Sequence, residues 1–151
     1  PDHSVEVECS LSLWDEHSVE VECSLSHSGR FGTLLDHLGM PLRQKDDAAL
    51  VNLPQLVALA KHQNVAIKAS AAPGASSVGY PYRNLHDYLH AVYDAFGPDR
   101  MFWGTDITRM PCTWRQCVTL FTEELSWLSP QDKDLIMGQA ICRWIGWDLI
   151  P

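Results

Sequence analysis

The pattern of hydrophobic and polar residues beyond position 30 alternates between short apolar runs and longer stretches of helical spacing. Apolar runs predict buried strands at residues 33–37, 64–70 and 101–106. Apolar residues three or four positions apart predict helices at residues 52–63, 84–96, 113–125 and 129–145. The order strand, helix, strand, helix, strand, helix, helix is typical of an α/β fold with a parallel sheet and right-handed crossovers.

Two helix starts carry recognisable capping signals. Ser129 precedes Pro130 and an acidic residue at position 132, which predicts a capped helix beginning there. Asn52 precedes a stretch with Pro54 in its first turn, and we expect it to be an N-cap.

The first 30 residues differ from the rest, because residues 3–12 recur identically as residues 17–26. Each copy alternates polar and apolar residues, which predicts a half-buried strand, and the copies could pair as a hairpin with residues 13–16 at the turn. Only about seven residues separate Ser26 from the next predicted strand, too few for a crossover helix. We therefore divide the chain into a duplicated, rearranged segment at 1–30 and a regular α/β region at 31–151.

Composition narrows the classes of function. The net charge is −8 and no basic stripe occurs, which disfavours nucleic acid as a partner. No apolar run approaches the ~18 residues of a membrane span. The five cysteines have no CxxC spacing, which favours reduced thiols over a disulfide framework. No glycine-rich phosphate-binding motif follows a strand. We expect a cytoplasmic protein, without a membrane partner, that acts on a small-molecule substrate.

The predicted strands place polar side chains at one rim, because functional groups of parallel α/β folds gather at the carboxyl ends of strands. Asp36 and His37 end the first strand, Lys68 and Ser70 lie near the end of the second, and Asp106 ends the third. Histidine and aspartate serve both as metal ligands and as proton-transfer groups. Both residue types can also be purely structural at such positions; aspartate, for example, commonly caps a loop.

Four segments, in order, resemble the C-terminal half of the amidohydrolase-related family. They lie at residues 35–41 (LDHLGMP), 64–70 (NVAIKAS), 93–106 (YDAFGPDRMFWGTD) and 136–147 (IMGQAICRWIGW). Members are (β/α)8-barrel hydrolases and decarboxylases, often metal-dependent, some acting on lactones or small carboxylated substrates. The resemblance covers roughly residues 30–149 and implies a partial (β/α)8 (TIM) barrel containing about the last four βα units.

The resemblance also implies functions for individual residues. Asp106 would lie on barrel strand eight, bind a divalent metal (zinc or manganese) and act as general base on water. His37 would lie on strand six and contact metal or substrate, so both are candidate catalytic residues and metal ligands. Arg109 and Tyr82 lie in loops near the predicted rim and are candidate substrate-binding residues. Arg109 could bind a substrate carboxylate through two parallel hydrogen bonds.

The chain departs from the family in ways that leave alternatives open. The family's first-strand HxH pair is absent, and the chain is about 100 residues shorter than the usual barrel of ~250. One alternative is a catalytically incomplete half-barrel whose open edges pair with a second copy, as a homo-oligomer, or with a partner. A decarboxylase of the same family is another. A third is a complete small α/β binding domain in which Asp106 and His37 are structural.

Overall fold

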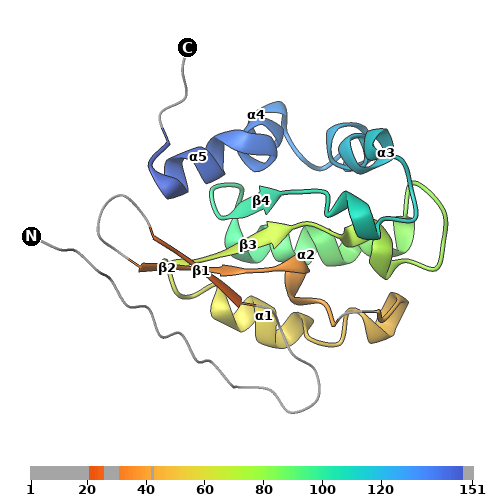
Figure 1. Ribbon diagram of the computed structural model, residues 1–151, viewed down its shortest axis with the longest axis horizontal. Helices are drawn as coiled ribbons and strands as arrows, with labels where there is room; N and C mark the ends of the chain where they lie inside the picture. The colour runs from red at the N-terminus through yellow and green to blue at the C-terminus, as the bar shows by residue number, and fades with distance from the viewer. Residues whose placement is uncertain (1–20, 26–30, 42, 148–151) are drawn as a thin grey trace, which may run out of the picture.

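The computed structural model describes residues 21–25, 31–41 and 43–147, and its centre is a four-stranded sheet (Figure 1). The strands lie in the order β1 (Val21–Leu25), β2 (Phe31–Leu35), β3 (Val65–Ala69) and β4 (Met101–Trp103). β2, β3 and β4 are parallel. The predicted alternation of parallel strands with helices is therefore confirmed.

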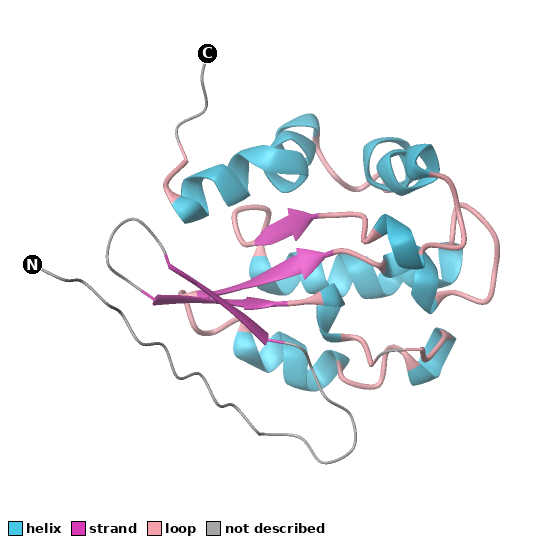
Figure 2. Ribbon diagram, in the orientation of Figure 1, coloured by secondary structure: helices cyan, strands magenta, loops and turns pink. Residues whose placement is uncertain are grey.

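Helices cover both faces of this sheet (Figure 2). They are α1 (Leu53–Leu59), α2 (His86–Phe96), α3 (Trp114–Thr119), α4 (Pro130–Asp134) and α5 (Ala140–Ile145). α3 and α4 each continue into a five-residue π-helical segment, at Leu120–Glu124 and Leu135–Gln139. A π segment inserts one extra residue into a helical turn. The two long helices predicted from residue 113 onward are thus each interrupted.

Alternate residues of the strands pack into two separate hydrophobic clusters. Leu35, Ile67 and Met101 belong to the larger cluster, which includes residues of α1 and α2. Leu34, Ala66 and Phe102 belong to a smaller cluster with residues of the 135–139 segment and α5. Because side chains alternate between the two faces of a strand, one short apolar run supplies both clusters. This two-sided burial explains why the strands are continuously apolar.

Capping matches the sequence at one predicted helix start and differs at the other. The Ser129 side chain accepts from the Asp132 backbone N–H, and the Asp132 carboxylate accepts from Ser129, forming a capping box. Asn52 occupies the N-cap position of α1 but makes no capping hydrogen bond. Its Nδ2 donates instead to the Gly39 carbonyl at 3.3 Å, which ties α1 to the turn after β2.

β1 corrects one part of the predicted fold. It runs antiparallel to β2, with Cys23 opposite Thr33, whereas a strand of a (β/α)8 barrel would be parallel. Only residues 26–30 connect the two strands, and a parallel connection needs about a dozen residues or more. The described residues therefore hold three parallel strands and one antiparallel strand, rather than four parallel βα units. The predicted pairing of the two repeats involves residues 1–20 and lies outside the described residues.

The amino ends of the strands are fastened by Arg100. Its guanidinium donates to the carbonyl oxygens of His62 at 2.9 Å and Val65 at 3.0 Å, and it lies over the Phe96 ring at 5.4 Å from the centroid. One side chain thus links the end of α2, the start of β3 and the start of β4. This end of the sheet is opposite to the one that carries the candidate site.

The contact of Trp144 with Gly32 fixes α5 on the sheet. A Cβ atom at Gly32 would lie 2.7 Å from Cζ2 of Trp144, so no side chain fits in β2 at this point. The Trp144 ring also packs on Phe102, with centroids 5.8 Å apart. The absence of a side chain at position 32 therefore allows the indole to lie directly on the strand backbone.

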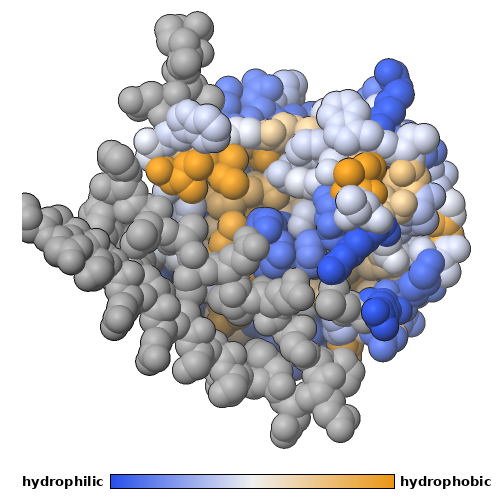
Figure 3. Space-filling model, in the orientation of Figure 1, coloured by the Kyte–Doolittle hydropathy of each residue, from blue (hydrophilic) through white to orange (hydrophobic). Residues whose placement is uncertain are grey.

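The molecular surface mixes apolar and polar areas. On the face in Figure 3, hydrophobic residues are exposed over α5 and close to α3, and hydrophilic residues lie between these two areas. Across the part of the chain that the structure describes, no helix has both the length and the apolarity needed to cross a membrane.

Candidate active site

The chain leaves each parallel strand through a residue in the left-handed backbone conformation. These residues are His37 (φ 46°) after β2, Ala71 (φ 61°) after β3 and Asp106 (φ 50°) after β4. Histidine and aspartate adopt this conformation more readily than most residues, but it still costs of the order of 1 kcal/mol. Strained backbone of this kind is found preferentially at functional sites. Both candidate catalytic residues are therefore held in unusual conformations at the same rim.

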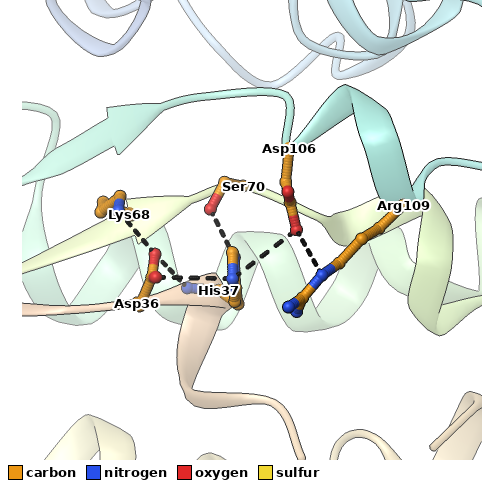
Figure 4. Close-up of polar contacts among 6 residues, drawn as sticks. All are labelled: Asp36, His37, Lys68, Ser70, Asp106 and Arg109. Atoms are coloured by element: carbon orange, nitrogen blue, oxygen red, sulfur yellow. Dashed lines mark hydrogen bonds and ion pairs between the residues drawn. The ribbon is translucent and has the colours of Figure 1, made fainter. Parts of the chain in front are cut away.

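His37 is at the centre of a polar network that joins all three parallel strands (Figure 4). Its Nδ1 lies 2.9 Å from the Ser70 hydroxyl oxygen. Its Nε2 lies 3.6 Å from Asp106 Oδ2 and 3.4 Å from Asp36 Oδ2. Because two carboxylates flank Nε2, the geometry favours a proton on Nε2 and a hydrogen bond donated by Ser70 to Nδ1.

Asp36 anchors the network from beneath. It is 7% exposed, and its Oδ1 accepts from the His37 backbone N–H at 3.0 Å and pairs with Lys68 Nζ at 2.8 Å. A buried carboxylate is tolerated when a cation and hydrogen bonds compensate for its lost hydration. Lys68 thus neutralises Asp36, and Asp106 is the second carboxylate beside the imidazole Nε2.

Asp106 presents a carboxylate oxygen that nothing in the described residues hydrogen-bonds. Oδ2 is buried and accepts no hydrogen bond, although His37 Nε2 lies at 3.6 Å and Arg109 Nε at 3.7 Å. Buried polar atoms of folded proteins normally have hydrogen-bond partners, and exceptions point to a catalytic or ligand-binding function. This oxygen thus lies between His37 and Arg109 without a hydrogen bond to either.

A cavity of about 470 Å³ opens beside this network. Its walls come from the loops that follow β2, β3 and β4. The lining residues are His37, Met40, Pro41, Arg43, Gln44, Ala71, Gly74, Ala75, Asp106, Arg109 and Met110. The cavity has the volume of a small-molecule site, and its wall combines one carboxylate, two guanidinium groups and apolar side chains.

The structure brings three of the four predicted site residues together. His37, Asp106 and Arg109 all line the cavity. Tyr82 is not among the lining residues; it is 4% exposed and packs edge-on against Tyr80, with centroids 5.9 Å apart. Burial, followed by a hydrogen bond with Cys112, raises the pKa of the Tyr82 hydroxyl above its ordinary value. Its contact with a substrate stays a prediction.

The sequence did not predict the contacts of Ser70 and Lys68, nor that Arg43 and Met110 line the cavity. Ser70 and Lys68 were placed at the rim, but their partners His37 and Asp36 follow only from the spacing of adjacent strands. Strand alternation was the available signal, since Ala69 between them packs into the larger core cluster. Arg43 and Met110 line the cavity from irregular loops, for which no periodic pattern exists.

The described residues do not by themselves form a complete metal site. His37 and Asp106 are two suitable donors, and the partnerless Oδ2 of Asp106 is consistent with a ligand atom. No group of three or more His, Cys, Asp or Glu side chains in the described ranges could hold a metal ion together. Catalytic zinc commonly has three protein ligands, so at least one further donor would be needed.

Comparison with solved structures finds similar folds among amidohydrolases. An amidohydrolase from Burkholderia multivorans, solved with bound zinc, is 25% identical with a TM-score of 0.63; the match covers 75% of this chain and 43% of that one. A structure of a B. multivorans amidohydrolase with bound HEPES is 26% identical with a TM-score of 0.61, and the match covers 75% of this chain and 44% of that one. A Pseudomonas putida protein provisionally assigned as a 2-pyrone-4,6-dicarboxylic acid hydrolase is 23% identical with a TM-score of 0.56. That match covers 78% of this chain and 44% of the other.

The chain spans less than half the length of these structures. A search of curated proteins found no significant match. Comparison with protein families matches residues 31–147 to the amidohydrolase family, which covers most of the chain and agrees with the resemblance seen in its motifs. The chain therefore belongs to the amidohydrolase family.

Proposed function

We propose that this chain carries one part of a hydrolase active site, which acts on a small carboxylated or lactone-type substrate with Asp106 as general base. The observation that carries the proposal is the buried, hydrogen-bond-free Oδ2 of Asp106, beside His37 at the wall of a cavity. The assigned names of similar structures support the class of reaction, since they include a provisional hydrolase of a pyrone dicarboxylate.

Asp106 would take a proton from a water molecule that attacks the substrate carbonyl. Its Oδ2 has no hydrogen-bond donor to compete with that water within the described residues. General-base catalysis of this kind contributes about 10²- to 10⁴-fold to a rate. Asp106 has a left-handed backbone, with φ 50°, at the point where the chain turns away from β4.

His37 would orient Asp106 and bind the substrate. With Ser70 donating to Nδ1, the Nε2–H group is directed toward the space between the two carboxylates and the cavity. From there it can donate to a substrate oxygen on which negative charge develops. Asp36, neutralised by Lys68, holds the backbone of His37 and contributes no net charge to the cavity.

Arg109 would bind a carboxylate of the substrate. Its side chain is 54% exposed at the cavity wall, and its Nε lies 3.7 Å from Asp106 Oδ2. A guanidinium can hold a carboxylate through two parallel hydrogen bonds, which fixes the orientation of the substrate as well as its position.

A divalent metal stays an expectation supported by the zinc in the B. multivorans structure. If a metal were bound, it would act as a Lewis acid near His37 and Asp106. Because the described residues offer only two of the donors it needs, we assign no catalytic step to it.

A second candidate function is that of an incomplete half-barrel that associates with itself or with a partner. The specific observation in its favour is that the chain matches only 43% of a similar amidohydrolase. β4 is an edge strand of the described sheet. An edge strand offers unpaired backbone N–H and C=O groups to which another chain can bind.

Hydrolysis of a panel of carboxylated esters and lactones by the purified chain tests the first function. Asp106→Asn should lower kcat/KM by at least about 100-fold, as expected for loss of a general base. The matched control is Asp134→Asn, which removes an exposed carboxylate on α4, away from the cavity. A rate for Asp106→Asn within a factor of about two of the parent chain would exclude Asp106 as the base.

Size-exclusion chromatography and metal analysis of the same preparation test the second function. An inactive chain that elutes as a dimer, with no stoichiometric metal, supports the half-barrel. An active monomer excludes it.

A further inference from the structure

Two cysteines lie in contact immediately after the segment that carries Asp106 and Arg109. The Sγ atoms of Cys112 and Cys117 are 3.5 Å apart. Cys112 directly precedes Thr113, the N-cap of α3, and Cys117 is the fourth residue of that helix. Residues at these two positions commonly pack on each other as a hydrophobic staple. The start of the helix therefore brings the two sulfur atoms together.

The helix start is also held rigidly by its capping interactions. The Thr113 hydroxyl accepts from the Gln116 backbone N–H at 3.3 Å, and the Gln116 side chain accepts from the Thr113 N–H at 3.1 Å. Trp103 of β4 donates its Nε1–H to the Cys117 carbonyl at 3.3 Å, which ties this turn to the sheet. The contact between the sulfurs is thus part of a fixed turn.

We propose that Cys112 and Cys117 form a redox-active dithiol, a site at which a hydroperoxide converts the two thiols into an intramolecular disulfide. The sulfurs need to approach by roughly 1.5 Å to reach the S–S bond length of ~2.05 Å. This site is separate from the proposed hydrolase function and does not depend on it.

The two thiols differ in access, and this sets the order of the reaction. Cys112 is half-buried, whereas Cys117 is only 3% exposed. Burial, followed by a hydrogen bond with Cys112, raises the pKa of the Cys117 thiol to about 12, so that it is protonated at neutral pH. The thiolate is the form that reacts with oxidants. Cys112 therefore reacts first, and Cys117 acts as the resolving cysteine.

The chemistry balances in two steps. The Cys112 thiolate attacks the distal oxygen of the hydroperoxide; an S–O bond forms, the O–O bond breaks, and the alkoxide leaves with the proton lost from Cys112. The Cys117 sulfur then attacks the sulfenic sulfur of Cys112; the S–S bond forms, the S–O bond breaks, and the hydroxide takes the Cys117 proton as water. Two thiols and one hydroperoxide give one disulfide, one alcohol and one water.

Oxidation would act on the wall of the candidate active site. Met110, two residues before Cys112, lines the cavity, and Arg109 precedes it. A disulfide would tether this segment covalently to α3. Cys112 also packs against the larger core cluster, which contains Tyr82. The redox state of the pair would thus reach both the cavity wall and the packing beneath it.

Peptide mapping of the full chain tests the proposal directly. The native chain is treated with one equivalent of hydrogen peroxide, alkylated with iodoacetamide in denaturant, and digested with trypsin. Cleavage after Arg109, Arg115 and Lys133 places the two cysteines on separate peptides, 110–115 and 116–133. We expect these two peptides joined, with the mass of the pair less two hydrogens, in more than half of the molecules, and their separation by dithiothreitol.

Two variants control the assignment. Cys142→Ser removes a half-buried thiol on α5, a helix whose Ile141 and Trp144 pack with the other cluster, and the joined peptides should persist. Cys117→Ser should leave Cys112 as a trapped sulfenic acid, detected by dimedone. If Cys117→Ser does not fold, the Cys142→Ser chain alone decides. Full alkylation of both cysteines after peroxide, or predominant joining of either one to Cys9, Cys23 or Cys142, would overturn the proposal.

Discussion

The imidazole Nε2 of His37 lies 3.6 Å from Oδ2 of Asp106, although the two residues follow different strands of the sheet. This separation is too long for a direct hydrogen bond. The carboxylate oxygen therefore keeps its capacity to accept a proton while the imidazole still orients it. Ser70 holds the opposite ring nitrogen, Nδ1, and Asp36 Oδ2 lies 3.4 Å from the same Nε2.

The tautomer of His37 is a first test of this arrangement. We expect neutral His37 to carry its proton on Nε2, because two carboxylate oxygens flank that nitrogen and Ser70 can donate to Nδ1. The ¹⁵N chemical shifts of the ring report the tautomer. Ser70→Ala should shift the Nδ1 resonance and cost about 1 kcal/mol of stability through the lost hydrogen bond. A proton found on Nδ1 would contradict the assignment.

Lys68 should matter for stability through its buried partner. Lys68→Met leaves the Asp36 carboxylate, which is 7% exposed, without its cation at 2.8 Å. We expect a loss of about 2 kcal/mol, less than for a fully buried pair because the Lys68 side chain is 28% exposed. Urea denaturation measures the change. The double variant Lys68→Met/Asp36→Asn should recover part of it, and strictly additive losses would show that the pair is not coupled.

A methyl group at position 32 should loosen α5 from the sheet. In Gly32→Ala the new Cβ would meet Cζ2 of Trp144 at 2.7 Å, so we expect a loss of about 1–3 kcal/mol from overpacking. Gly79→Ala is the matched control, because nothing lies within 4 Å of a Cβ there. In the Trp144→Leu background the Gly32→Ala cost should shrink. Equal costs in both backgrounds would remove the indole as the cause.

The cap of α4 predicts a pH dependence. The hydrogen bond from the Ser129 hydroxyl is the main cause that holds the pKa of Asp132 below its ordinary value of 3.8. A weaker contribution comes from Tyr93, and both act against the effect of burial, which raises the pKa. A carboxyl whose pKa is lower in the folded chain stabilises it above pH ~4, and this contribution is lost as the pH falls below that value. Asp132→Asn should remove that part of the acid dependence, measured by thermal unfolding between pH 2 and 5.

Ser129→Ala tests the same cap at neutral pH. It should cost about 1 kcal/mol, because the first-turn N–H of Asp132 loses its acceptor. Ser126→Ala, three residues earlier at an exposed position outside the helix, is the control and should change stability by less than about 0.5 kcal/mol.

The sequence predicted the parallel strands well because each is buried on both faces and so is apolar throughout. It misjudged where they end: β2 stops at Leu35 and β4 at Trp103, before the candidate residues His37 and Asp106. Those residues lie in left-handed turns after the strands. Apolar runs do not reveal a change of backbone conformation in the polar residues that follow them.

Other features depend on tertiary contacts that a local pattern does not contain. The direction of β1 follows from a connection too short for a crossover, whereas alternation alone predicts only a strand. Tyr82 follows a Gly/Pro-rich loop and was predicted to bind substrate, yet it is 4% exposed and packs edge-on against Tyr80. The π segments after α3 and α4 escape detection because one extra residue shifts the helical period without changing composition.

Arg100 makes its stabilising contacts at the end of the sheet away from the candidate active site. By joining His62, Val65 and Phe96 at the amino ends of the strands, it stabilises the sheet from the end that no substrate would reach. The loops at the opposite rim can therefore change in sequence and length without loosening β3 from β4. Substitutions at cavity-lining residues such as Arg43 and Met110 would therefore change the shape and charge of the cavity while these contacts at the amino ends stay in place.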